Sequence, residues 1–175
     1  MIEQKYKSAS TSMNKKQPAW LGKIVGKYYA TSGDTVLDYG GGQFDTTTKY
    51  LEDLGITSMI YDPYNQDVES NRKALEKNDY DFAMLSNVLN VIAEREVRLL
   101  IVEDAKKHLR KGGTLLIKVY EGDGSGTLKV NEKRNSCQLN QKIRFYFWEV
   151  AAVFGAANTH FASHQGKKII VAVNN

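Results

Sequence analysis

The chain has 175 residues, of which 42% are hydrophobic and 25% charged, and a formal net charge of +4. This length suits one domain with a substantial core, and no run approaches the ~20 apolar residues of a membrane helix. The first twenty residues lack the apolar stretch of a secretory signal, and the single cysteine cannot form an internal disulfide. We therefore expect a cytoplasmic protein that does not enter a membrane.

The positive charge is concentrated near the N-terminus. Residues 1–30 carry six lysines against Glu3, whereas the remaining residues include 18 basic and 19 acidic side chains. A basic segment can attract nucleic acid or another polyanion, and a solvated, partly disordered segment is the alternative. We predict a basic N-terminal arm over residues 1–17 and a single domain over residues 18–175.

Helical and strand patterns alternate along the chain. Apolar periodicity predicts helices over residues 18–29, 45–55, 66–78, 94–111 and 137–155. Asp45 is expected to cap the second helix, and Gly112 and Gly113 to end the fourth. Short apolar runs predict strands over residues 34–39, 57–62, 80–87 and 114–121. A closing hairpin is expected over residues 159–173, with its turn near Gln165 and Gly166.

This alternation predicts an α/β fold, a doubly wound, Rossmann-like sheet that is mostly parallel, with helices on both faces. The closing hairpin would add an antiparallel edge. In such sheets ligands bind outside the carboxyl ends of the strands, near the point where the strand order reverses.

A glycine triplet follows the first predicted strand, in "VLDYGGGQFD". Glycines there let the chain turn tightly and bring backbone N–H groups against a ligand. Asp62 ends the next strand, where a carboxylate can accept hydrogen bonds from the two ribose hydroxyls of a nucleoside. The sequence therefore predicts a nucleoside site at these strand ends.

The pattern distinguishes between kinds of nucleoside ligand. A dinucleotide fingerprint would need a glycine where Asp45 stands, and a phosphate loop would need the G-K-[ST] signature, which is absent. Asp38, just before the glycines, suits instead a ligand that carries an ammonium and a sulfonium group. This indicates S-adenosylmethionine.

Four motifs in chain order resemble those of class I S-adenosylmethionine-dependent methyltransferases. They are "VLDYGGG", "MIYDPY", "YDFAMLSNVLNVI" and "LRKGGTLLIKVY". The similarity extends over about residues 18–175, and "VYEGDGSG" is also similar to a segment of small, phage- or mobile-element-like members. The resemblance implies a methyltransferase that uses S-adenosylmethionine.

The resemblance also implies a set of cofactor-binding residues at the strand ends. Asp38 would bind the methionine amine, Asp62 the ribose hydroxyls, and Pro63 and Tyr64 would lie near the adenine. The full set is Asp38, Gly40, Gly41, Gly42, Asp62, Pro63, Tyr64, Ser86 and Asn87. Each has a structural alternative: Asp62 could serve the turn "DPYN", and Asn87 and Asn90 could cap a helix.

Two features depart from the family pattern. Phe44 replaces the usual third glycine of the turn, so the following helix could pack differently. Between Asp62 and Tyr80 there is room for one helix but hardly for a strand, so the family's third strand is expected to be missing. No acidic partner for the adenine amine is therefore named.

The catalytic residues are not defined by the sequence. Glu121 or Asp123 could act as a general base if residues 121–142 lie over the site as a lid, and Asn87 could contact the acceptor. An exposed loop with solvated acids is the alternative. The only cysteine, Cys137, does not follow the fourth strand as carbon-5 cytosine chemistry requires, and the three histidines have no zinc spacing, so no metal is expected.

The sequence therefore predicts methyl transfer to an unidentified acceptor, which could be nucleic acid or another anion because residues 127–144 are also basic. Two alternatives stay open. One is a non-catalytic module that binds S-adenosylmethionine, and the other is a Rossmann domain that binds a nicotinamide cofactor.

Overall fold

The computed structural model describes residues 2–11 and 14–175. Four strands form the parallel part of a six-stranded sheet: β1 (Thr35–Tyr39), β2 (Thr57–Tyr61), β3 (Tyr80–Ser86) and β4 (Leu109–Lys118). The hairpin of β7 (Thr159–His164) and β8 (Lys167–Val173) completes the order β2-β1-β3-β4-β8-β7 and runs antiparallel to β4. The predicted doubly wound sheet is confirmed.

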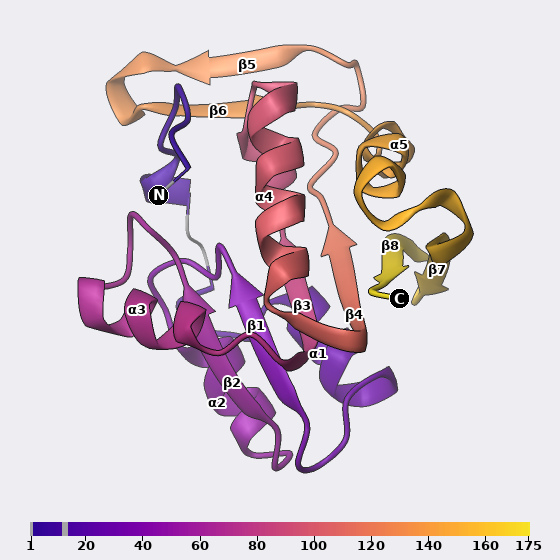
Figure 1. Ribbon diagram of the computed structural model, residues 1–175. Coiled ribbons are helices and arrows are strands. Elements are labelled where there is room, and N and C mark those ends of the chain that lie inside the picture. The colour runs from indigo at the N-terminus through magenta and orange to yellow at the C-terminus, as the bar shows by residue number, and fades with distance from the viewer. Residues whose placement is uncertain (1, 12–13) are drawn as a thin grey trace.

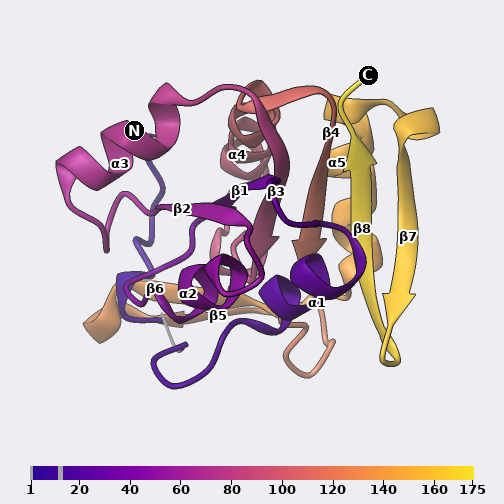
Figure 2. The same ribbon diagram turned by 90° about the horizontal axis from the view of Figure 1, so that it is seen from below.

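Helices cover both faces of this sheet (Figure 2). On one face lie α3 (Val68–Glu76), α4 (Arg95–Lys107) and α5 (Ile143–Phe154), which share a buried cluster with Leu37 and Leu85. On the other face lie α1 (Trp20–Tyr28) and α2 (Thr46–Glu52), which pack with Val36 and Met84. Neighbouring residues of each strand therefore face different cores, which explains their continuous apolar runs.

The closing hairpin has the predicted turn. Gln165 and Gly166 connect β7 to β8, and both have positive φ angles, 50° and 74°. A two-residue turn of this hand matches the right-handed twist of the strands it joins.

The predicted absence of a third strand is also confirmed. Residues 62–79, all of them described, contain α3 as their one helix and no strand, so β2 forms an edge of the sheet.

The predicted end of the fourth helix is wrong. Helix α4 ends at Lys107, and Gly112 and Gly113 belong to β4. The pairing register between β3 and β4 shifts next to them, and a Cβ at Gly113 would lie 2.9 Å from the carbonyl oxygen of Tyr80. These glycines therefore accommodate a bulge where two backbones approach closely.

The last predicted helix also begins later than expected. Residues 136–139 form strand β6 (Ser136–Leu139), which pairs with β5 (Leu128–Asn131) in a separate hairpin. A short 3₁₀ helix, Glu132–Arg134, connects them, and Asn135 completes the turn with a φ of 45°. Helix α5 begins only at Ile143, whose N–H donates to the Glu121 carboxylate at 2.9 Å.

Asp45 precedes α2 as predicted, but its side chain does not cap the helix. It forms an ion pair with Lys49 instead, with 2.8 Å between the charged atoms. Among the described residues, no helix is both long and apolar enough to cross a membrane.

Candidate functional site

A cavity of about 780 Å³ lies at the carboxyl ends of β1, β2 and β3. Figure 1 shows the β5–β6 hairpin and the N-terminal segment beyond the arrowheads of β1 and β4. All of the sequence-predicted cofactor residues line the cavity: Asp38, Gly40, Gly41, Gly42, Asp62, Pro63, Tyr64, Ser86 and Asn87. The structure therefore brings the whole predicted set together in one place.

The glycine turn needs its glycines for two different reasons. Gly40 and Gly42 have φ angles of 77° and 80°, in the left-handed region that other residues rarely adopt. Gly41 lies against the aspartate before it, because an added Cβ would be 2.7 Å from Cγ and 2.8 Å from Oδ2 of Asp38. The backbone N–H of Gly40 donates to the Tyr61 carbonyl at 2.7 Å, which ties the turn to β2.

Asp38 is a buried carboxylate that lines the cavity without a partner for one oxygen. The residue is 2% exposed, and its Oδ1 forms no hydrogen bond within the described part of the chain. Burial, and then the nearby charge of Asp62, raise the pKa of Asp38 to about 7. A cationic ligand group placed beside Oδ1 would relieve both effects by favouring the ionised form.

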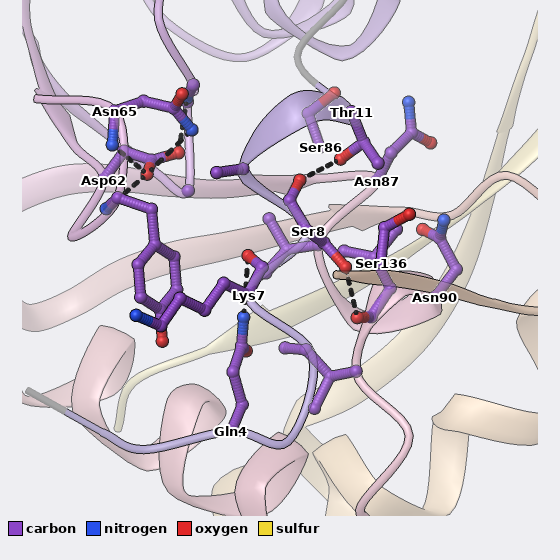
Figure 3. Close-up of a pocket in the computed structure, with 18 of the residues that line it drawn as sticks. Gln4, Lys7, Ser8, Thr11, Asp62, Asn65, Ser86, Asn87, Asn90 and Ser136 are labelled. Atoms are coloured by element: carbon purple, nitrogen blue, oxygen red, sulfur yellow. Dashed lines mark hydrogen bonds between the residues drawn. The ribbon is translucent and has the colours of Figure 1, made fainter. Parts of the chain in front are cut away.

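Asp62 organises the loop that follows β2. Its Oδ1 accepts hydrogen bonds from the backbone N–H groups of Tyr64 and Asn65, both at 3.0 Å, and from the Asn65 side chain at 3.2 Å (Figure 3). Its Oδ2 accepts one from the N–H of Gly42 at 2.9 Å. The turn role that the sequence left open is therefore observed. Because an ionised carboxylate oxygen can accept two hydrogen bonds, Oδ2 keeps capacity for a ligand hydroxyl.

The two asparagines after β3 differ in their roles. Asn87 lines the cavity with a φ of 61°, and its N–H donates to the Lys118 carbonyl at 2.7 Å. The 3₁₀ helix Leu89–Val91 has Val88 as its N-cap, so neither asparagine caps it. Asn90 is 1% exposed and connects this helix to β6, because its amide donates to Gln138 at 2.9 Å.

The two carboxylates proposed as bases do not line the cavity. Glu121 accepts the N–H of Ile143 at the start of α5. Asp123 is exposed, accepts the Ser125 N–H at 3.0 Å and pairs with Lys129 at 2.9 Å. The lid expected over residues 121–142 is nevertheless present in part, since Lys129–Asn131 and Ser136–Gln138 of the β5–β6 hairpin line the cavity.

Sequence reasoning missed the N-terminal segment, residues 2–11, which we call the N-terminal wall. Tyr6 and Ser8 are 7% and 5% exposed, so the expectation of a solvated segment is wrong for these two residues. The Ser8 N–H donates to the Asn135 carbonyl at 2.9 Å, and its hydroxyl donates to that of Val91 at 3.2 Å. The sequence carries no periodic signal here, and Ile2 and Tyr6 are the large apolar residues that could have indicated packing.

The site has no evident metal centre. Within residues 2–11 and 14–175, no group of three His, Cys, Asp or Glu side chains could hold a metal ion. The arrangement offers instead two carboxylates, close-lying backbone N–H groups and a largely apolar cavity of a size typical for ligand pockets, roughly 300–1,000 Å³.

Solved structures with a similar architecture include several methyltransferases. The 1,6-didemethyltoxoflavin-N1-methyltransferase of Burkholderia thailandensis, with bound S-adenosylhomocysteine, has a TM-score of 0.62 and 18% identity over 88% of this chain and 76% of its own. A SAM-dependent methyltransferase from Methanosarcina mazei has a TM-score of 0.57 and 13% identity, over 86% of this chain and 96% of its own. A SAM-bound amino pentose methyltransferase from Micromonospora echinaspora has a TM-score of 0.53 and 12% identity, over 99% of this chain and 92% of its own.

No protein-family model matches the sequence, and no curated protein is significantly similar to it. The structural similarity therefore establishes the fold, which is that of class I S-adenosylmethionine-dependent methyltransferases. The cytoplasmic location and the phage-like character of "VYEGDGSG" stay predictions.

Proposed function

We propose that this protein binds S-adenosylmethionine at the glycine turn and transfers its methyl group to an acceptor. The observation that carries the proposal is the unpartnered Oδ1 of Asp38, buried in the wall of a cavity at the strand ends of a methyltransferase fold. An unpaired buried carboxylate oxygen is costly, and a cationic ligand group offsets that cost.

The residues would share the binding in the following way. Asp38 would hold the methionine ammonium, with the backbone of Gly40 and Gly42 alongside. Asp62 would accept a ribose hydroxyl at Oδ2, and Pro63 and Tyr64 would lie beside the adenine. The backbone at Ser86 and Asn87 would border the reacting end. Each of these groups lines the cavity.

Catalysis would depend mainly on alignment. The sulfonium of the cofactor activates the methyl group, so placing the acceptor in line with the departing sulfur can supply much of the rate. Asn87 stays a candidate for contacting the acceptor because it lines the cavity, whereas Glu121 and Asp123 do not.

The acceptor itself stays a prediction. The proposal of an anionic or nucleic-acid acceptor is supported by Lys7 and Lys129, which line the cavity. They come from the two basic segments that the sequence indicated.

A second candidate is a module that binds S-adenosylmethionine without catalysis. The specific observation that favours it is that neither acid proposed as a base reaches the cavity. A labelling experiment that finds tight cofactor binding without transfer to any acceptor would support this module.

The binding proposal can be tested by thermal denaturation with S-adenosylhomocysteine, NAD and ATP. At 100 times its Kd, S-adenosylhomocysteine should stabilise the protein by about 2.7 kcal/mol. A clear shift with NAD and none with S-adenosylhomocysteine would contradict the proposal and favour a nicotinamide site.

A test of Asp62 needs a control that distinguishes its role in the turn from its role in binding the cofactor. Asp62→Ala should weaken S-adenosylhomocysteine binding by about 1.5–3 kcal/mol in calorimetric titration, because a charge-assisted hydrogen bond is lost. Asp67 makes a similar local contact, accepting the Ser70 N–H at 2.8 Å at the start of α3, but does not line the cavity. Asp67→Ala should therefore leave the affinity unchanged, and equal affinities in both variants would assign Asp62 to the turn alone.

A further inference from the structure

The cavity has an acceptor end with a distinct chemistry. This end is lined by the N-terminal wall, by residues 90–92 and by the β5–β6 hairpin. Its polar side chains are amides, hydroxyls and the ammonium of Lys129. Figure 3 shows Gln4, Ser8, Asn90 and Ser136 among them, and Gln138 also lines the cavity. Among the described lining residues the carboxylates are Asp38 and Asp62, both at the opposite, cofactor end. No described carboxylate thus lines the acceptor end itself, and the nearby charge is that of Glu94 behind the lining, which after burial raises the pKa of the Cys137 thiol to about 11.

The N-terminal wall bridges the cavity from one side to the other. On the cofactor side, the Lys7 ammonium lies 5.9 Å from the centre of the Tyr64 ring. On the acceptor side, Ser8 donates to Val91 and Asn135, and its hydroxyl accepts the N–H of Cys137 at 3.4 Å. Figure 3 shows Lys7 and Ser8 between Asp62 and Ser136.

Ser8 is the point where the wall is fastened. Besides its contacts across the cavity, it closes a 3₁₀ turn, because both the N–H and the hydroxyl of Thr11 donate to its carbonyl, at 3.0 and 2.6 Å. Its φ of 52° lies in the left-handed region, which costs a serine about 1 kcal/mol or more. The surrounding hydrogen bonds therefore hold the wall in one specific position across the cavity.

We propose that the acceptor is a small molecule without positive charge, enclosed at the acceptor end by the N-terminal wall, which parts to admit it. This inference rests on the proposed methyltransferase function. A nucleic acid chain would have to displace the wall permanently and break its contacts with the hairpin, whereas a small molecule can react beneath it.

The lining is consistent with an acceptor that needs no base. In the transfer, a lone pair of the acceptor atom forms the new bond to the methyl carbon, while the carbon–sulfur bond breaks and its electron pair returns to sulfur. An anionic acceptor gives a neutral product without losing a proton. Such an anion would be favoured by Lys7, which lies between the two ends, and less by Lys129, whose charge already pairs with Asp123 at 2.9 Å.

The wall can be locked by a cross-link to the only cysteine. The Ser8 hydroxyl and the Cys137 thiol both contact the Val91 carbonyl oxygen, at 3.2 and 3.1 Å. In Ser8→Cys two thiols would therefore be neighbours, and an oxidant should join them as a disulfide, or a short bifunctional thiol-reactive electrophile as a pair of thioethers. The double variant Ser8→Cys/Cys137→Ser cannot be joined and serves as the matched control.

The readout is the transfer of labelled methyl from S-adenosylmethionine. An extract of the source cells is first split into a small-molecule filtrate and a macromolecular retentate, and each fraction is incubated with the protein and labelled S-adenosylmethionine. The wild type should label the filtrate, the reduced Ser8→Cys variant sets the reference rate for its own oxidised form, and oxidation should lower that rate at least tenfold until reductant restores it. Oxidation should change the labelling by the control variant less than twofold. Passing the filtrate over a cation-exchange resin first should leave the labelling intact.

Several results would overturn the proposal. One is label found in DNA, RNA or protein. Another is filtrate labelling that survives the cross-link or is lost after passage over the cation-exchange resin. The last is failure of both reagents to join residues 8 and 137. Stabilisation of the reduced variant by S-adenosylhomocysteine tests the proposed function separately. If that stabilisation is absent, the cofactor proposal fails; if it is present and nothing is labelled, only the acceptor proposal fails.

Discussion

The two ends of the cavity are built in different ways. The cofactor end consists of loops that directly follow β1, β2 and β3, so its residues lie between positions 38 and 87 and are held by the register of one parallel sheet. The acceptor end joins three segments that are distant in sequence, and side chains such as Ser8 and Asn90 connect them. Strand pairing thus positions the segments of the cofactor end, with Asp62 holding the loop after β2, whereas the three segments of the acceptor end are joined mainly by side-chain contacts.

The largest effect is expected from Arg98→Ala, which removes a buried support of the acceptor end. Arg98 is 2% exposed, pairs with Glu149 at 2.6 Å, and donates to the carbonyls of Ile92 and Ala93 at 3.0 and 2.9 Å. Removing this partner leaves Glu149 with only Arg95, 4.0 Å away, and should cost about 3–5 kcal/mol in urea unfolding. The exposed Arg72→Ala is the control and should cost far less; equal losses would show that the buried pair does not support this end.

Asp38→Asn should remove a pH dependence that belongs to the cofactor end. Since the pKa of Asp38 is raised to about 7, the folded protein keeps a proton that the unfolded chain loses near pH 4. The contribution of Asp38 to stability is therefore fully present at low pH and is lost as the pH rises to about 7. A shift of about three units corresponds to at most roughly 4 kcal/mol.

Urea unfolding of the free protein at about pH 5 and about pH 8 measures this effect. Asp38→Asn should flatten the difference and be more stable than the wild type at the higher pH, while binding S-adenosylmethionine more weakly. The exposed Asp79→Asn should keep the wild-type slope. A slope that persists in Asp38→Asn would have to come from another group.

Gly41→Ala should damage the cofactor end through packing. Its new Cβ would approach the Asp38 carboxyl group to within 2.7 Å and Ile60 Cγ2 to 3.0 Å. Overpacking of this kind costs about 1–3 kcal/mol, and the displaced carboxylate should also bind the cofactor less well. If stability and affinity both match the wild type, Asp38 must be free to rotate, and its position would not be fixed by the glycine turn.

Ser8→Ala tests the acceptor end with the smallest expected change. Loss of the hydroxyl removes its contacts with the Val91 carbonyl and the Cys137 N–H, which should cost about 0.5–1.5 kcal/mol. Amide hydrogen exchange should rise at Cys137 and stay unchanged at Gly40 in the cofactor end. Ser125→Ala, in an exposed loop, should alter neither amide, and faster exchange at both ends would show that the two halves are not independent.

The difference between the ends also explains what could be predicted from sequence. Apolar runs and glycines define β1 to β3, and parallel strands place their carboxyl ends at one edge, so all predicted cofactor residues meet. Strand β5 has four exposed residues, and its alternation of Leu128 and Val130 with polar neighbours extends over only four positions, which is too short to distinguish it from a loop. The N-terminal wall is fastened by single hydrogen bonds, which leave no periodic pattern.

Local chemistry was ambiguous in two further places. Two glycines after a helical pattern predict a helix end, yet Gly112 and Gly113 accommodate a bulge that depends on the neighbouring strand β3. A carboxylate in "DPYN" can serve a turn or a ligand, and Asp62 already forms the turn while retaining acceptor capacity at Oδ2. Both outcomes are determined by tertiary neighbours.

The contact between Ser8 and Cys137 joins residues 129 positions apart. During synthesis Ser8 leaves the ribosome early, and Cys137 is added only after most of the chain has been made. The strands of the cofactor end, by contrast, are complete once residue 87 has emerged. Closing so long a loop is entropically costly, and the contacts that offset this cost form only after the hairpin has been synthesised. The N-terminal wall should therefore be the last part of the site to form in a new molecule.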